Sequence, residues 1–271
     1  MKPLCPAIPA LLAGALAAGP AAAQSAQDLA KQVANPVASL ISVPFQYNYN
    51  NGYGAQDGHQ SYVNIQPVWP FALTPKWNVI VRTIVPVIDQ SDVVPGTGSQ
   101  FGLGDTTQSL FLSPKEPGPG GLIWGVGPAF LWPTATEDEL GQGKWGLGPT
   151  GVALVQKGRW TYGALANHIW SVADAGGEDR PDVSSSFVQP FVAYNTRTAV
   201  TLTLNSESSY NWKESEWSIP INALVTKTTH VGKLPVQFGV GARYWVETPE
   251  SGPDGWGARA VVTFLFPKGK A

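Results

Sequence analysis

From about residue 40 onward, apolar and polar residues alternate with a period of two in a series of short tracts. The tract 198–206 reads TAVTLTLNS, in which Val and Leu alternate with Thr and Asn. In a β-strand this spacing sends the two kinds of side chain to opposite faces. The polar faces carry Asn, Gln, Thr and Arg, which the core of a soluble barrel would not hold. We therefore expect strands with one face toward lipid and the other toward a polar lumen.

Twelve such tracts are predicted, and each has about the length that a tilted strand needs to cross a bilayer. The fourth to seventh tracts alternate ambiguously, so no inner face is assigned to them. The predicted fold is an all-β, antiparallel up-and-down transmembrane barrel of about twelve strands, with ten or fourteen as the nearest alternatives. An even number places both termini on one side of the membrane, which we expect to be the periplasm. The tracts are 39–49, 60–70, 76–87, 101–112, 121–132, 146–156, 160–171, 184–194, 198–206, 216–226, 234–245 and 255–266.

Two further segments precede the predicted barrel at 39–271. Residues 1–23 have the features of a secretory signal peptide: one early lysine, an apolar run of small residues and a closing Ala-Ala-Ala. The segment 24–38 is predicted to hold a short amphipathic helix, which ends at Asn35-Pro36 because the residue before a proline resists helical geometry. This helix could plug the lumen, lie on the periplasmic surface or be disordered. An ordered position near the base of the barrel is the favoured interpretation.

The composition fits a membrane barrel better than a soluble domain. Charged residues make up 13% of the chain, against about 25% in a typical soluble domain. No stretch after the signal peptide reaches about 18 consecutive apolar residues, so no transmembrane helix is predicted. Cys5, the one cysteine, lies in the signal peptide, which excludes a disulfide scaffold and a thiolate metal site in the mature chain. The formal net charge of −2, or −3 without Lys2, argues against a nucleic-acid partner.

Charge is divided between two kinds of connection. The connections after odd-numbered tracts are long and acidic, and those after even-numbered tracts are short and basic. An outer-membrane barrel has this asymmetry, because its long loops emerge on the cell surface and its tight turns face the periplasm. The acidic set is Asp57, Asp89, Asp92, Glu137, Asp138, Glu139, Asp174, Glu178, Asp179, Asp182, Glu207, Glu214, Glu216, Glu247, Glu250 and Asp254. The basic set is Lys76, Lys115, Lys157, Arg159, Arg197, Lys227 and Lys233.

The predicted location is therefore the outer membrane of a Gram-negative bacterium, with periplasmic termini. The predicted partners are outer-membrane lipid, lipopolysaccharide and a small-molecule solute. A last strand that ends on an aromatic residue, as this one does at Phe266, is also usual for clients of the barrel assembly machinery.

Three arginines belong to neither kind of connection. Arg82, Arg243 and Arg259 fall at predicted inward positions, and the last two are expected at similar height near the outer mouth. One interpretation is a basic strip that selects anionic solutes. The favoured one is structural pairing with an acid, because a charge in a narrow lumen needs a partner. The candidate acids are Asp105, Glu207 and Glu216, and the selectivity candidates are Arg82, Asp105, Arg243 and Arg259.

Two other groups of side chains suggest chemistry. The acids at 137–139 could bind a divalent cation, but three consecutive acids rarely converge on one ion. A solvated acidic face is therefore expected, and neither a metal site nor a cofactor is predicted. His168 and Ser171 invite comparison with outer-membrane acyl hydrolases. They are three residues apart and face opposite sides of a strand, so catalysis would need a serine from a neighbouring strand. We expect no enzymatic activity.

Seven segments, which span nearly the whole mature chain, have a recognisable sequence. They are NPVASLISVPFQYNYN (35–50), RTIVPVI (82–88), FGLGDTTQSLFLSP (101–114), PTATEDELGQGKWGLGP (133–149), NHIWSVA (167–173), QPFVAYN (189–195) and FLFPK (264–268). Together they resemble a family of outer-membrane transporters grouped with the MetA pathway of phenol degradation, some of which carry the label neuromedin U. The resemblance implies a barrel that passes hydrophobic or aromatic small molecules. It brings no established binding residues with it.

The predicted function is passive passage of small molecules through the outer membrane. Twelve strands lie between the filled eight-stranded barrels and the open sixteen-stranded porins, so a narrow or partly plugged pore is expected. The alternatives are a lipid acyl hydrolase that uses His168, and a closed barrel with a structural or adhesive role.

Overall fold

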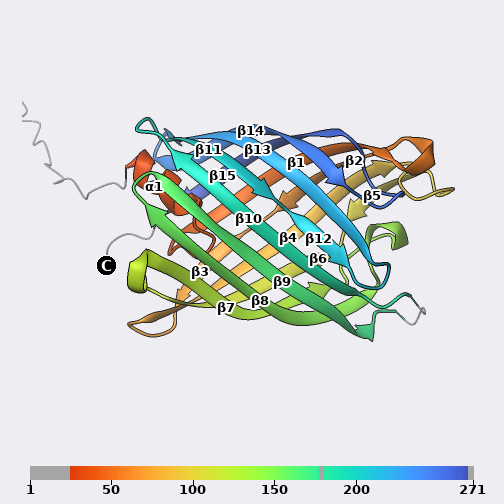
Figure 1. Cartoon of the computed structure of the whole chain (residues 1–271), viewed down its shortest axis with the longest axis horizontal. Helices are drawn as coiled ribbons and strands as arrows, with labels where there is room; N and C mark the ends of the chain where they lie inside the picture. The colour runs from red at the N-terminus through yellow and green to blue at the C-terminus, as the bar shows by residue number, and fades with distance from the viewer. Residues whose placement is uncertain (1–24, 177–179, 268–271) are drawn as a thin grey trace, which may run out of the picture.

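The computed structural model describes residues 25–176 and 180–267, so the predicted signal peptide at 1–23 lies outside the described residues. Within the described ranges the chain forms one closed antiparallel β-barrel of twelve strands, with a short N-terminal helix (Figure 1). This confirms the predicted fold and strand number. None of the helices in these ranges is long and apolar enough to cross a membrane.

Three of the twelve strands are each divided into two labelled parts. β2 and β3, β5 and β6, and β11 and β12 follow one another along the wall, and each pair occupies one place in the barrel. The elements are α1 (Ala26–Val33), β1 (Ile41–Tyr53), η1 (Gly54–Gln56), β2 (Gly58–Ile65), β3 (Val68–Ala72), β4 (Trp77–Ser91), β5 (Ser99–Leu103), β6 (Thr106–Pro114), η2 (Pro119–Gly121), β7 (Leu122–Trp132), η3 (Asp138–Leu140), β8 (Lys144–Lys157), β9 (Trp160–Asp174), β10 (Ser184–Asn195), β11 (Val200–Ser206), β12 (Ser208–Asn211), β13 (Glu216–Val231), β14 (Leu234–Glu247) and β15 (Trp256–Phe266).

The barrel closes where the first strand meets the last. β1 and β15 pair antiparallel from Ile41 opposite Phe266 to Tyr49 opposite Ala258. β9 and β10 join the two halves of the wall on the other side. Closure removes the free edges that β1 and β15 would have in an open sheet, which suits a bilayer because it offers backbone groups no water to bond with.

The two faces of the wall have opposite chemistry. Large apolar side chains are exposed on the outer surface, and they include Phe45, Tyr47, Leu202, Leu204, Phe238 and Val240. Their sequence neighbours on the inner face are polar and buried, and they include Asn48, Thr201, Asn222, Gln237 and Thr263. This arrangement inverts that of a soluble barrel and suits a wall that stands in lipid.

The connections divide the barrel into two ends. The turn end carries the connections β3–β4, β6–β7, β8–β9, β10–β11 and β13–β14, together with α1. The loop end carries β1–β2, β4–β5, β7–β8, β9–β10, β12–β13 and β14–β15. In Figure 1 the turn end lies at the left and the loop end at the right.

Several connections are shorter than predicted because the strands continue beyond the predicted tracts. β13 runs to Val231, so the connection expected over 226–234 is a tight turn in which Gly232 has a φ of 61°. Such left-handed values favour glycine. At the loop end the β1–β2 connection covers only residues 54–57. Glu207, assigned from sequence to a long acidic loop, instead lies between β11 and β12 and faces the lumen.

The helix α1 forms because its ends are satisfied locally. The Ser25 hydroxyl accepts a hydrogen bond from the Asp28 backbone N–H at 3.1 Å. Asp28 in the first turn and Lys31 in the last turn complement the helix dipole. The helix ends at Val33, shortly before Pro36.

The N-terminal segment, residues 25–40, lies inside the lumen at the turn end. Leu29 of α1 is fully buried against the inward-facing Leu265 of β15. Val37 packs in a cluster of inward-facing side chains from the opposite wall. Gln156 of β8 donates a hydrogen bond to the Lys31 carbonyl at 2.8 Å. The segment is thus ordered and fills part of the barrel's base.

Candidate functional site in the lumen

A charged cluster crosses one side of the lumen. Glu207 Oε2 lies 2.7 Å from Nη2 of Arg243 and 2.7 Å from Nη2 of Arg259, while its Oε1 lies 2.9 Å from Nη1 of Arg259. Arg259 therefore meets the carboxylate with two donors, a bidentate geometry. Both arginine side chains are almost fully buried, so their shared carboxylate offsets much of the cost of removing them from water. Of the three acids that the sequence offered, Glu207 is the partner.

Neutral side chains hold these two guanidinium groups in place. Arg243 Nε donates to Asn222 Oδ1 at 2.7 Å, and its Nη1 donates to the Tyr62 hydroxyl at 2.9 Å. Arg259 Nε donates to Asn48 Oδ1 at 2.7 Å. The cluster thereby links the wall from β11 round to β2. None of these three partners is predicted from the sequence, although the inward position of each in an alternating tract is a usable signal.

Arg82 of β4 stands apart from this cluster. Its Nη2 donates to Gln66 Oε1 at 3.0 Å, and this is the one hydrogen bond that its guanidinium group makes within the described residues. It forms no ion pair with any carboxylate in the described part of the chain. Three guanidinium groups set against one carboxylate leave two positive charges in excess here.

Asp105 is not part of the arginine group, contrary to its place among the lumen candidates. It lies between β5 and β6, where its Oδ1 accepts from the Ala135 N–H at 3.2 Å and its Oδ2 from the Gln142 N–H at 2.5 Å. Asp105 therefore anchors the β7–β8 connection at the loop end.

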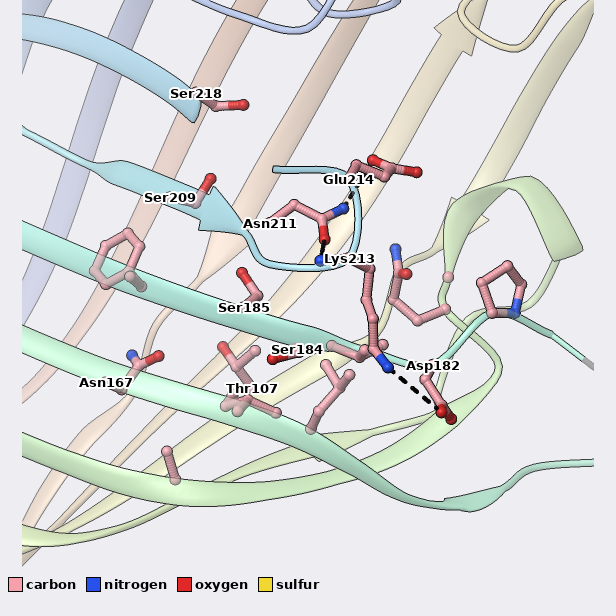
Figure 2. A pocket seen from close by; sticks show the side chains of 18 of the residues that line it. Thr107, Asn167, Asp182, Ser184, Ser185, Ser209, Asn211, Lys213, Glu214 and Ser218 are labelled. Atoms are coloured by element: carbon pink, nitrogen blue, oxygen red, sulfur yellow. Dashed lines mark hydrogen bonds and ion pairs between the residues drawn. The ribbon is translucent and has the colours of Figure 1, made fainter. Parts of the chain in front are cut away.

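Two cavities meet at Arg82. The larger, of about 620 Å³, extends from the loop end and is shown in Figure 2. The smaller, of about 170 Å³, lies between Arg82 and the N-terminal segment and is also lined by Gln66 and Gln189. Among the described residues, Arg82 is the one that lines both. It therefore occupies the junction of any route through the barrel.

The lining of the larger cavity is mixed. On β10, β12 and β13 it is mostly hydroxyl and amide groups, among them Ser185, Ser209 and Asn211 (Figure 2), together with Phe187 and Glu216. On β4, β7 and β9 it includes an apolar patch formed by Ile84, Ala129, Leu131 and Ile169. Such a cavity suits a solute that has both a polar and an apolar part.

A second apolar cluster lies deeper on the same side of the lumen. Its buried members are Val37, Ile80, Phe111, Val152, Leu154 and Leu165. Apart from Val37, they come from β4, β6, β8 and β9, which include the tracts whose faces the sequence left unassigned. The inner faces there carry apolar side chains as well as polar ones such as Ser109 and Thr150, so the alternation is unclear.

The loop end carries its own ionic contacts. The Asp182 carboxylate accepts a hydrogen bond from the Ser171 hydroxyl at 3.0 Å and lies 3.7 Å from both Lys213 and Lys144. These contacts, the Ser171 hydrogen bond foremost, hold the pKa of Asp182 below its usual value. Lys144 also pairs with Asp174. Figure 2 shows the Lys213–Asp182 pair at the rim of the larger cavity.

The acidic run at 137–139 is engaged by an arginine. Arg180 Nη2 lies 2.8 Å from Asp138 Oδ1, and its Nη1 donates to the Asp138 and Gly141 carbonyls at 2.9 and 3.1 Å. Within the described ranges, no group of three or more His, Cys, Asp or Glu side chains is placed to hold a metal ion.

His168 lies on the outer face of the wall. Its Nδ1 is 2.7 Å from the Ser186 hydroxyl of the neighbouring strand β10, and its ring contacts that of Trp170 at a tilt of 50°, with 4.1 Å between centroids. The Trp212 indole N–H donates to the same Ser186 hydroxyl at 2.9 Å. Ser171 bonds Asp182 instead of His168, as the spacing predicted.

The fold is similar to that of a known outer membrane channel. The crystal structure of that channel, from Pseudomonas putida F1, aligns with a TM-score of 0.66 and 14% sequence identity, over 84% of this chain and 96% of the other. At this identity the likeness shows the fold alone.

Two solved phospholipases are more distant. The outer membrane phospholipases of Salmonella typhi and Escherichia coli share 10% identity over 83% of this chain and 90% of theirs, with TM-scores of 0.47 and 0.48. These scores are too low to support an inference about this chain. No protein-family model and no curated protein matches the sequence.

Proposed function

We propose that the protein is an outer-membrane channel that passes small molecules passively. The observation that carries this proposal is the pair of lumen cavities, of about 620 and 170 Å³, which meet at Arg82 and together reach from the loop end to the N-terminal segment. Passage along such a route needs no covalent chemistry. The width and the lining of the lumen decide which solute enters and leaves.

The proposed setting is the outer membrane of a Gram-negative bacterium, with the turn end and both termini in the periplasm. The apolar outer face, the closed wall and the likeness in fold to an outer membrane channel support it. We include membership of the channel family grouped with the MetA pathway of phenol degradation in the same proposal. The seven resembling segments support that assignment.

The lining favours solutes with an apolar or aromatic body. Ile84, Leu131 and Ile169 supply an apolar surface in the larger cavity, which adjoins the hydroxyl groups of β10 because Ile169 pairs with Ser185 across β9 and β10. A fully hydrophilic solute would leave the apolar patch exposed to water, whereas a wholly apolar one would leave the hydroxyl groups without partners.

Conductance of the purified chain in a planar bilayer tests the proposal. We expect discrete steps of small conductance, because the N-terminal segment fills part of the turn end. Bilayers without protein and bilayers given unfolded protein are the controls. If the folded protein neither conducts ions nor releases small solutes from proteoliposomes, the channel proposal is wrong, and a closed structural or adhesive barrel is favoured.

A second candidate function is hydrolysis of lipid acyl esters at His168. The specific observation is the 2.7 Å contact of its Nδ1 with the Ser186 hydroxyl on the lipid-facing surface, since a general base must reach its nucleophile. Against it, no carboxylate among the described residues bonds the ring, so the third group that orients such a base is missing. Ester hydrolysis by wild type that is lost in both His168→Ala and Ser186→Ala would support this activity. Absence of ester hydrolysis by wild type would exclude this candidate function.

A further inference from the structure

We propose that Arg82 binds the carboxylate of a small amphipathic anion, whose apolar body lies on the Ile84, Leu131 and Ile169 surface of the larger cavity. This inference rests on the proposed channel function and names the class of solute. It concerns a carboxylic acid with an aromatic or short aliphatic body.

The charge balance of the lumen gives the first reason. Glu207 is shared by Arg243 and Arg259, and its two oxygens accept three of their N–H groups. Arg82 has no ion pair within the described part of the chain. A charged side chain inside a membrane barrel is costly unless it is solvated or paired, and such residues commonly mark a solute pathway. A bound anion would supply the pair that Arg82 lacks.

The geometry of the three guanidinium groups singles out Arg82. The guanidinium groups of Arg243 and Arg259 are buried, and their donors are directed at Glu207, Asn222, Tyr62 and Asn48. Arg82 is only half-buried, lines both cavities, and uses one N–H group, on Gln66. Its planar fork therefore keeps donors available, and a carboxylate matches such a fork with two hydrogen bonds.

The surroundings of Arg82 specify the rest of the solute. Ile84 follows on the same inward face of β4, two residues toward the loop end, and lines the larger cavity with Arg82. Leu131 and Ile169 belong to a buried apolar cluster of the same cavity. An anion with an apolar body can satisfy the arginine and cover this patch at once, whereas inorganic anions can do only the first.

Calorimetric titration of the folded, detergent-solubilised full chain tests the inference. The probes are benzoate, acetate, benzyl alcohol and benzylammonium, which separate the charge from the apolar body. The variants are Arg82→Gln, Arg82→Lys and, as a control that removes one exposed positive charge at the turn end, Lys115→Gln. Circular dichroism establishes that each variant is folded.

We expect benzoate to bind wild type more tightly than the other three probes. Arg82→Gln should weaken benzoate binding about 10-fold or more, because a hydrogen bond to a charged group is worth about 1.5–3 kcal/mol and each 1.4 kcal/mol is about tenfold. Arg82→Lys should retain part of the affinity, and Lys115→Gln should match wild type.

Three results with wild type would overturn the inference. They are the absence of saturable benzoate binding to wild type, equal binding of benzoate and benzyl alcohol, and equal binding of benzoate and acetate. Benzoate affinity unchanged in folded Arg82→Gln would also overturn it. Should Arg82→Gln not fold, the comparison of the four probes on wild type still decides.

The channel proposal and this inference fail separately. If Arg82-dependent benzoate binding is present but the protein does not conduct, the channel proposal alone is contradicted. If the protein conducts and benzoate affinity is the same in wild type and Arg82→Gln, only the anion site is contradicted.

Discussion

The two sides of the lumen differ in chemistry. From β11 round to β2 the inner wall is polar, and Glu207, Arg243 and Arg259 with their amide partners dominate it. From β6 to β9 the inner wall is mixed: side chains such as Phe111 and Leu154 pack in an apolar cluster, and polar side chains such as Thr150 and Thr161 lie beside it. The lumen is therefore neither a uniform aqueous pore nor a filled core. β4, which carries Arg82, lies between the two sides.

The polar side should be the more sensitive to loss of one group. Glu207→Gln leaves two buried guanidinium groups without their carboxylate, and removal of one partner of a buried ion pair costs about 3–5 kcal/mol. We expect a fall of that size in the free energy of unfolding, measured by denaturant titration of the refolded barrel. The matched control is Glu247→Gln, at an exposed position at the end of β14. Equal stability of the two variants would show that the charged cluster does not hold this side together.

The apolar side should depend on packing. Leu154→Ala creates a cavity in the cluster that includes Val37, and buried Leu→Ala changes cost about 2–5 kcal/mol. Leu204→Ala on the lipid face is the control, because that side chain is half exposed and lipid can fill the space it leaves. Denaturant titration should show the larger loss for Leu154→Ala. Similar losses would mean that the inner cluster is loosely packed.

The N-terminal segment bridges the two sides, since Leu29 meets Leu265 and Val37 meets the apolar cluster. Deleting residues 25–38 should therefore widen the turn end, and single-channel conductance should rise severalfold. Val37→Asp in the full chain should also raise conductance, but by less. An unpaired charge buried beside Ile80 and Phe111 is costly and should loosen the packing of the segment against the wall. Unchanged conductance in both variants would place the narrowest point elsewhere.

The smallest expected effect concerns pH at the loop end. The pKa of Asp182 is held below its usual value by Ser171, Lys213 and Lys144. Its contribution to stability is thus present above the ordinary Asp value of about 4 and is lost as the pH falls through the lower folded value. The unfolding temperature of wild type should therefore fall between about pH 5 and pH 2, and in Asp182→Asn this fall should be smaller. An equal fall in wild type and Asp182→Asn would show that other carboxylates cause this pH dependence.

Much of the fold followed from the alternation of residues. Tracts such as 198–206 and 234–245 have one apolar and one polar face, so the strand and its orientation could be predicted together. The twelve strands and the short N-terminal helix are confirmed. The faces of the fourth to seventh tracts could not be predicted, because large apolar side chains occur on their inner sides as well as on their outer sides.

The position of Glu207 could not be predicted from the alternation of residues. Its place after a strand suggested a surface loop, but β12 continues the strand and turns Glu207 inward, where Arg243 and Arg259 meet it. Asp105 shows the reverse, because it was expected near the arginines and instead anchors a loop at Ala135 and Gln142.

The wall of the barrel could thus be predicted from the sequence: strands of membrane-crossing length, a count of about twelve, and an apolar exterior. These depend on local period and on the solvent that each face meets. The contacts inside the lumen become visible only in the folded barrel. They include which acid pairs with which arginine and where the N-terminal segment lies. They also include the position of Arg82 between two cavities, without an ion pair among the described residues. The reason is physical: closure of the barrel brings together side chains from strands far apart in the chain, and no local pattern encodes those distances.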